Sequence, residues 1–223
     1  MRGMQKIRKS NPNGRILITS GPTQEPLDPV RFLSNASSGR MGVALAEAAL
    51  NAGFDVTVVS GPVRVTYPDG AEVLHVTTTA EMLDASLCVF ERPDCAGVIG
   101  AAAPCDFQVE RAAEHKIRKR RDGVPIMISL VETPDILARL AAIRQPGQRI
   151  VGFALESEPH DGAGLDHALE KLRHKQCDLL VLNHPASIGA DETTVTLIGT
   201  DGATLARITA SKHTIANEIL QRF

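Results

Sequence analysis

Short apolar runs rich in β-branched residues alternate along the chain with longer segments whose apolar residues recur at helical spacing. The first run, residues 16–19, ends in Ser20-Gly21-Pro22, and the Ala- and Leu-rich segment 39–53 follows it as a predicted helix that stops at Gly53. The same reasoning predicts further strands at 55–60, 71–76, 97–103, 125–131, 149–154 and 178–182, a hairpin of 193–199 with 203–208, and helices at 79–90 (capped by Thr79), 134–143, 164–174 and 211–223.

Apolar strands that alternate with helices are typical of βαβ units with a parallel sheet covered on both faces. The predicted fold class is therefore α/β: a doubly wound, Rossmann-like and mostly parallel sheet with helices on both faces, plus a β-hairpin or flap excursion. Residues 105–131 leave the alternating pattern, so we expect the flap there. We expect one nucleotide-binding domain over 15–223, preceded by a flexible basic leader at 1–14, with ligands outside the carboxyl ends of the strands.

Composition narrows the possible function classes. The 223 residues carry 24 Lys and Arg against 26 Asp and Glu, a net charge of −2, which disfavours a general nucleic-acid binder. No apolar run approaches the roughly 20 residues that cross a bilayer, and the basic start has no apolar segment behind it. With 3% aromatic residues, ligand recognition must depend mainly on backbone and charge. Four Cys without a C-x-x-C pair favour small buried side chains in a reduced, cytoplasmic protein over a zinc site.

The connection between the first strand and the first helix, residues 21–38, is much longer than the usual two to six residues. It ends in Ser37-Ser38-Gly39, whose backbone N–H groups and hydroxyls suit an anion at a helix N-terminus. An ordinary helix cap is the simpler interpretation of this feature alone. The G-x-G-x-x-G dinucleotide fingerprint is missing here, which counts against a standard NAD-binding domain.

Two further segments carry candidate chemistry. Small residues at 100–103 would let a ligand approach the main chain, and Asp106 adds a carboxylate just past the strand. Residues 116–121 hold five basic side chains in six positions, which suits a polyphosphate, although a solvated charge run is the commoner case. Lys171 and Lys175 lie one helical turn apart and can share a face. None of the seven His follows a recognisable metal or catalytic pattern, and we assign no metal ligand.

The order of these motifs resembles that of the phosphopantothenoylcysteine synthetase (phosphopantothenate–cysteine ligase) family, the ligase domain of the bifunctional coenzyme A biosynthesis flavoproteins. The resemblance covers residue 15 to the C-terminus. The segments that carry it are Gly21-Pro22-Thr23, residues 25–31, Ser34-Asn35, Ser37-Ser38-Gly39, the alanine strand with Asp106, Lys116-Ile117-Arg118-Lys119, Pro134-Asp135-Ile136, Gly152-Phe153-Ala154 and Lys171, Lys175, Asp178 with Asn183.

The resemblance implies a two-step ligation in the cytoplasm. The carboxylate of 4′-phosphopantothenate attacks the α-phosphate of CTP with Mg²⁺ on the phosphates, giving an acyl-cytidylate and pyrophosphate, and the amino group of L-cysteine then displaces CMP. ATP use is the alternative within the family. The resemblance also implies a homodimer and a flavin-dependent phosphopantothenoylcysteine decarboxylase as a separate or fused partner; we expect no flavin in this chain, and no nucleic-acid or membrane partner.

The family's site residues carry over position by position. As catalytic residues the resemblance implies Asn35, which stabilises the acyl-nucleotide, Arg31, which orients it, and Lys116, which contacts the triphosphate. It implies substrate binding by Ser37, Ser38, Gly39 and Ala103. The implied nucleotide-binding residues are Gly100, Ala101, Ala102, Asp106, Lys116, Pro134, Asp135, Ile136, Leu137, Phe153, Lys171 and Lys175.

Several positions depart from the family pattern, namely Gln24, Pro104-Cys105, Arg118, Thr133 and His184. They leave Asn35, Lys116 and Asp106 in place and bear on base recognition. Two other function classes fit the residues less well: an atypical NAD(P) oxidoreductase, and a non-catalytic nucleotide sensor or nucleic-acid binder that uses the basic run.

Overall fold

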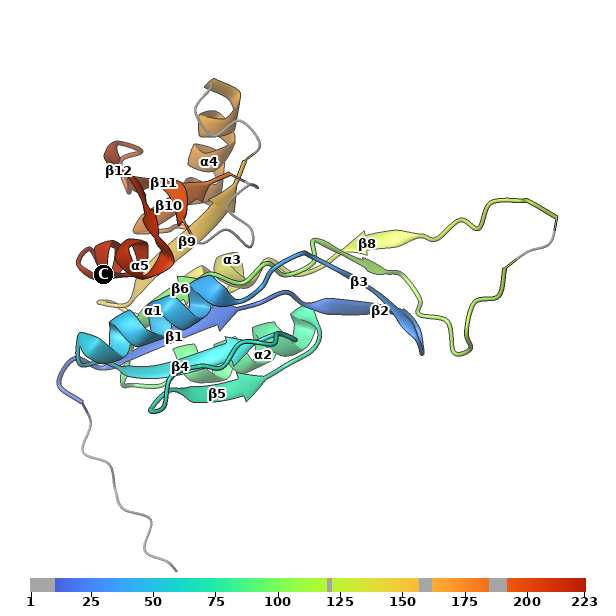
Figure 1. The fold of residues 1–223 in the computed structure, drawn as a ribbon, viewed down its shortest axis with the longest axis horizontal. Helices are drawn as coiled ribbons and strands as arrows, with labels where there is room; N and C mark the ends of the chain where they lie inside the picture. Colours follow the sequence, from blue (N-terminus) through green and yellow to red (C-terminus); the bar gives the residue numbers. More distant parts are fainter. Residues whose placement is uncertain (1–10, 120–121, 157–161, 185–191) are drawn as a thin grey trace, which may run out of the picture.

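The computed structural model describes residues 11–119, 122–156, 162–184 and 192–223. Its main sheet has eight strands in the order β12-β11-β10-β9-β6-β1-β4-β5 (Figure 1). The strands are β1 (Arg15–Ser20), β4 (Asp55–Ser60), β5 (Glu72–His75), β6 (Cys95–Gly100), β9 (Arg149–Leu155), β10 (Leu179–Asn183), β11 (Glu192–Gly199) and β12 (Thr204–Ser211).

The strand directions confirm the predicted mostly parallel, doubly wound sheet. All neighbours from β5 to β10 pair in parallel, and β11 and β12 add an antiparallel hairpin at one edge. The chain winds outward from β1 to β4 and β5, then returns to β6 on the other side of β1. The order of winding therefore reverses between β1 and β6, where open α/β sheets bind their ligands.

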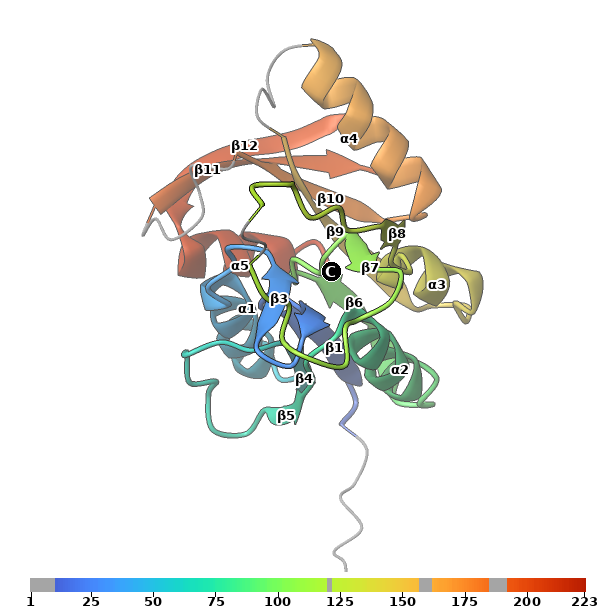
Figure 2. The ribbon, with the colours of Figure 1, turned by 90° about the vertical axis from the view of Figure 1, so that its right-hand side faces the viewer.

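Helices cover both faces of this sheet (Figure 2). One face is covered by α1 (Arg40–Asn51) and α5 (Lys212–Leu220), which share a core with Ile16 and Ile18. The other face is covered by α2 (Thr79–Phe90), α3 (Ile136–Ala142) and α4 (Gly162–His174), which share a second core with Leu17. Successive side chains of a strand point to opposite faces, so β1 needs an uninterrupted apolar run rather than an alternating one. Its six residues are all buried.

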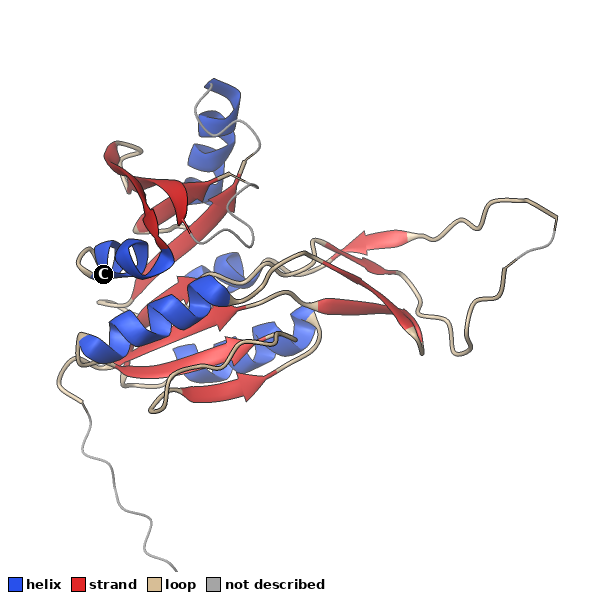
Figure 3. Cartoon of the chain, in the orientation of Figure 1, coloured by secondary structure: helices blue, strands red, loops and turns tan. Residues whose placement is uncertain are grey.

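Two small hairpins extend from the carboxyl end of the sheet (Figures 1 and 3). The long connection after β1 forms β2 (Gln24–Asp28) and β3 (Arg31–Ser34), where the sequence had suggested only a loop. The predicted strand 125–131 is wrong in extent: β8 covers Leu130–Glu132 and pairs with β7 (Phe107–Val109). Residues 124–128 have an apolar strand-like composition but lie outside the core, where Met127 is 90% exposed.

The expected helix cap at Thr79 is also wrong by one residue. Thr78 caps α2, its hydroxyl accepting from the N–H of Glu81 while the Glu81 carboxylate accepts from the N–H of Thr78. Thr79 is buried instead, with its hydroxyl 2.8 Å from that of Thr23. Among the described helices, none combines the length and hydrophobicity needed to span a bilayer.

Candidate functional site

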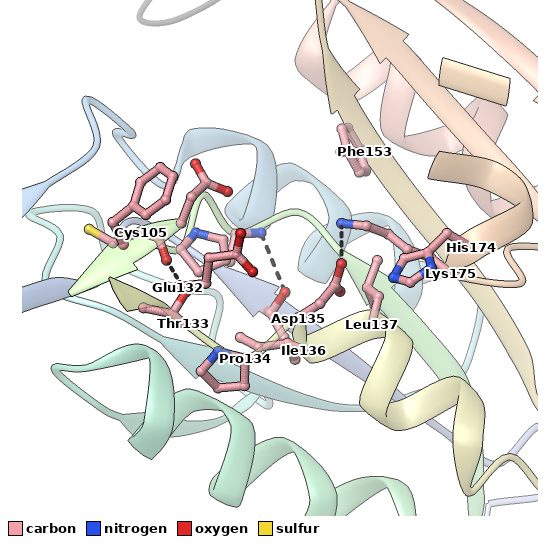
Figure 4. A pocket seen from close by; sticks show the side chains of 16 residues that line it. Cys105, Glu132, Thr133, Pro134, Asp135, Ile136, Leu137, Phe153, His174 and Lys175 are labelled. Carbon is pink, nitrogen blue, oxygen red and sulfur yellow. Dashed lines mark hydrogen bonds and ion pairs between the residues drawn. The ribbon is translucent and has the colours of Figure 1, made fainter. Parts of the chain in front are cut away.

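A pocket of about 370 Å³ opens at the carboxyl ends of β1, β6 and β9, beside the start of α3 and the end of α4 (Figure 4). It brings together most of the predicted nucleotide-binding residues, although they come from four separate stretches of sequence. Those that line it are Gly100, Ala102, Asp106, Pro134, Asp135, Ile136, Leu137, Phe153 and Lys175.

The glycine and alanine residues at the end of β6 form the floor of the pocket. A Cβ atom at Gly100 would lie 2.7 Å from Cδ1 of Leu137, so a larger residue there would force the Leu137 side chain to move. The N–H of Ala103 donates to the carbonyl of Gly21 over 2.9 Å, and that of Ala101 to the carbonyl of Thr19 over 3.2 Å. The end of β6 is thus joined to the loop after β1. Ala101 packs toward the α1 and α5 core rather than lining the pocket.

Ion pairs hold both predicted lysines, Lys171 on α4 and Lys175 directly after its last residue. Lys175 Nζ lies 3.2 Å from Oδ2 of Asp135, and Oδ1 of the same carboxylate accepts from the N–H of Ala138 over 3.1 Å, which caps α3. Lys171 Nζ lies 2.6 Å from Oε1 of Glu156, next to the end of β9. The structure therefore places Lys175 in the pocket wall and Lys171 one turn away, outside the lining residues.

Asn35 is held against the same floor. Its side-chain Nδ2 donates to the carbonyls of Ala103 and Pro104 over 3.2 and 2.9 Å. These two bonds use the amide nitrogen, so the acceptor capacity of its oxygen is left for a ligand. The adjacent Cys105 is fixed by its N–H, which donates to the hydroxyl of Thr23 over 2.8 Å.

The remaining predicted residues do not line the pocket. Ser37, Ser38 and Gly39 lead into α1, where Gly39 is the N-cap with φ 76° and no side-chain cap. The N–H groups of the first turn are therefore not occupied by a side chain of the N-cap residue. Arg31 lies on β3 and Lys116 in the segment between β7 and β8, both exposed to solvent.

Seven lining residues were not among the predicted site residues: Thr19, Pro104, Cys105, Phe107, Glu132, Thr133 and His174. Thr133 ties the two sides of the floor together, because its N–H donates to the carbonyl of Asp106 over 2.9 Å and its hydroxyl donates to that of Cys105. Its position directly before Pro134-Asp135 was the available signal. His174 precedes Lys175, and the missing metal or catalytic pattern gave no reason to select it.

Neither thiol chemistry nor a preformed metal centre is favoured here. Burial raises the pKa of the Cys105 thiol, against a smaller lowering by the Thr23 hydrogen bond, so Cys105 is a poor nucleophile near neutrality. Within the described ranges no three His, Cys, Asp or Glu side chains are grouped closely enough to hold a metal ion.

Comparison with known proteins identifies this arrangement. Residues 12–223 match the family described as "DNA/pantothenate metabolism flavoprotein C-terminal domain". The chain belongs to this family. The family resemblance drawn from the motifs is thereby confirmed.

The chain is 39% identical over 211 residues to the coenzyme A biosynthesis bifunctional protein CoaBC of Bacillus subtilis, covering 92% of this chain and 50% of that protein. The chain thus spans about half the length of the curated relatives it matches. A crystal structure of the CoaBC C-terminal domain superposes with a TM-score of 0.76 at 33% identity, covering 94% of this chain and 93% of the other. The fold is shared with a Cab2 H337A mutant in complex with phosphopantothenate-cysteine, with a TM-score of 0.75 at 22% identity, covering 94% and 86%.

Proposed function

We propose that this protein is a ligase that joins 4′-phosphopantothenate and L-cysteine in coenzyme A biosynthesis, using CTP. The observation that carries the proposal is the pocket itself, since it gathers the alanine floor, Asp106, the Pro134–Leu137 segment, Phe153 and Lys175 at the switch point of the sheet. The family membership and the CoaBC relatives support the same reaction.

The chemistry requires an activated carboxyl group, because a carboxylate is a poor electrophile with no adequate leaving group. We propose that the carboxylate of 4′-phosphopantothenate attacks the α-phosphorus of CTP, forming a C–O–P linkage and releasing pyrophosphate. The amine of cysteine then attacks the acyl carbon, forms the amide and expels CMP, and its proton passes to solvent. This chain supplies positioning and positive charge, which dominate catalysis of such transfers.

The nucleotide would lie over the alanine floor. Ala102 and the Pro134–Leu137 segment offer main-chain groups to the base, and Phe153 on β9 offers an aromatic ring. Lys175 would exchange its partner, from Asp135 to an anionic oxygen of the nucleotide. ATP in place of CTP is the alternative within the same reaction.

Mg²⁺ would arrive with the phosphates of CTP. Mg²⁺ commonly keeps several waters and uses only one or two protein carboxylates besides phosphates, and Asp106 and Glu132 are such carboxylates in the pocket lining. When bound, the ion neutralises charge on the phosphates.

The roles of Asn35 and Lys116 can be tested separately. Asn35→Asp would place a carboxylate against the carbonyls of Ala103 and Pro104, so we expect acyl-cytidylate to form and its conversion to slow at least tenfold. Lys116→Gln should suppress pyrophosphate release, whereas Lys119→Gln, in the same basic run, is the matched control. Normal product formation by Asn35→Asp would contradict its role.

The decisive assay supplies 4′-phosphopantothenate, L-cysteine, Mg²⁺ and either CTP or ATP, and measures pyrophosphate and the amide product. Product with CTP is expected; no turnover with either nucleotide would overturn the ligase assignment, and turnover with ATP alone would overturn the choice of CTP. The product would be the substrate of a phosphopantothenoylcysteine decarboxylase, which we expect as a partner in the cytoplasm.

We also propose a homodimer whose second copy covers the two hairpins. Val30 and Phe32 on the β2–β3 hairpin and Phe107 and Leu130 on β7 and β8 are each about half exposed, between 49% and 59%. Exposed apolar side chains gathered on arms that extend from the body of the protein are typical of an interface. Analytical ultracentrifugation should give twice the mass of 23.8 kDa, and Phe32→Asp should give the monomer; a monomeric wild type would overturn this part.

A further inference from the structure

We infer that Asp28 is a positioning residue that clasps the basic segment of the flap, and so presents Lys116 to the nucleotide. The inference rests on the proposed function for the role of Lys116. The contacts that carry it lie between the tip of the β2–β3 hairpin and residue 117, which are far apart in sequence.

Asp28 and Arg31 together hold both polar groups of Ile117. Oδ2 of Asp28 accepts from the N–H of Ile117 over 3.0 Å, while Nη2 of Arg31 donates to the carbonyl of Ile117. Arg31 Nη2 also lies 3.3 Å from Oδ2 of Asp28. The paired carboxylate and guanidinium thus bind the backbone of Ile117, one at its N–H and the other at its carbonyl.

The Asp28 side chain has no exposed surface, although it is part of a small hairpin at the edge of the protein. Its other oxygen accepts from the N–H of Val30 over 2.9 Å, which fixes the hairpin turn. Burial alone would raise the pKa of Asp28, but the hydrogen bonds from Val30 and Ile117 and the charge of Arg31 outweigh it and lower the pKa. The carboxylate therefore stays ionised at neutral pH, in the form that accepts these bonds.

A second contact shows that the flap follows the hairpin over several residues. The N–H of Ala113 donates to the carbonyl of Leu27 over 2.9 Å, one residue before Asp28. Lys116 lies between this contact and the clasped Ile117, so its backbone is held on both sides. Arg31, for which the family resemblance implies a role in orienting the acyl-nucleotide, here donates to the flap backbone.

The clasp can be measured without nucleotide by limited trypsin cleavage after Lys116, Arg118 and Lys119. Asp28→Ala should speed this cleavage at least about tenfold, the factor expected for losing a hydrogen bond to a charged group. Asp28→Asn keeps an acceptor for Ile117 and should show a smaller increase. Glu114→Gln, which alters an exposed flap carboxylate, is the matched control and should leave the rate unchanged.

Ile117→Pro tests the same bond from the flap side, because proline lacks the donated N–H. Trypsin does not cleave a Lys-Pro bond, so cleavage of this variant is measured after Arg118 and Lys119, and it decides the question if Asp28→Ala fails to fold. The Asp28→Asn/Ile117→Pro double variant should be cleaved no faster than Ile117→Pro alone, whereas additive effects would overturn the clasp.

In the ligase assay, Asp28→Asn should lower kcat/KM for CTP severalfold with an unchanged KM for cysteine. Faster cleavage with unchanged kcat/KM for CTP would overturn the positioning role. If the wild type forms no product at all, the proposed function fails, while the cleavage rates still decide whether the clasp exists.

Discussion

Asp135 is the residue at which stability and nucleotide binding can be separated most sharply. One carboxylate oxygen caps α3 at the N–H of Ala138, and the other pairs with Lys175 in the pocket wall. An Asn at this position can still cap the helix but cannot form the ion pair, whereas an Ala can do neither.

The two contributions have different magnitudes. Loss of the cap costs about 1 kcal/mol, within a range of roughly 0.5–2. The ion pair is partly exposed, with side chains 34% and 25% accessible for Asp135 and Lys175, so its loss is discounted to about 0.5 kcal/mol. Asp135→Ala should therefore cost about 1.5 kcal/mol and Asp135→Asn about 0.5 kcal/mol, or about 3–6 °C and 1–2 °C in Tm for a chain of this size.

Urea unfolding followed by far-UV circular dichroism measures both variants, and titration with CTP gives their affinities. Asp135→Asn releases Lys175 from its carboxylate, so its affinity for CTP should equal or exceed that of the wild type while its stability stays close to it. Equal loss of stability in the two variants would refute the cap argument, and weaker CTP binding by Asp135→Asn would refute the exchange of partners by Lys175.

Three further predictions concern other parts of the structure. Gly42→Ala should lower the free energy of unfolding in urea by about 1–3 kcal/mol, because the new Cβ would lie 2.0 Å from Oγ and 2.5 Å from Cβ of Ser20. Adding Ser20→Gly should restore part of this loss, and a failure to do so would contradict the steric argument. Burial raises the pKa of the Cys177 thiol to about 12. At pH 8 a thiol reagent should therefore label the exposed Cys88 rapidly and Cys177 only after unfolding. Rapid labelling of Cys177 in the folded protein would contradict this prediction. The pKa of Asp28 is lowered, so its stabilising bonds are present above the unfolded value of 3.8 and are lost as pH falls through the folded value. The difference in Tm between wild type and Asp28→Asn should accordingly stay constant from pH 8 to 5 and close in stronger acid; a difference that closes near neutrality would show that another group is responsible.

The secondary-structure errors have a common physical origin. Residues 125–131 have the composition of a strand, but a strand also needs a partner for its backbone. Most of this segment contacts neither a partner strand nor the core. Residues 21–38 contain three prolines and turn signals, yet 24–28 and 31–34 pair as a hairpin because Asp28 and Arg31 close its tip. Thr78 rather than Thr79 caps α2 because the Thr79 hydroxyl is committed to Thr23.

The sequence by itself determined the sheet and the family. A strand that is buried on both faces has apolar residues at successive positions, as in β1. Helices that connect such strands are typical of parallel pairing. The hydrophobic periodicity was therefore sufficient to predict the doubly wound fold. The motif order was sufficient to identify the family. Tertiary structure decided which of these residues meet. Local pattern contains no information about contacts such as Thr133 with Asp106, Lys175 with Asp135 or Asp28 with Ile117, since each joins segments whose distance is set by the packing of the whole chain.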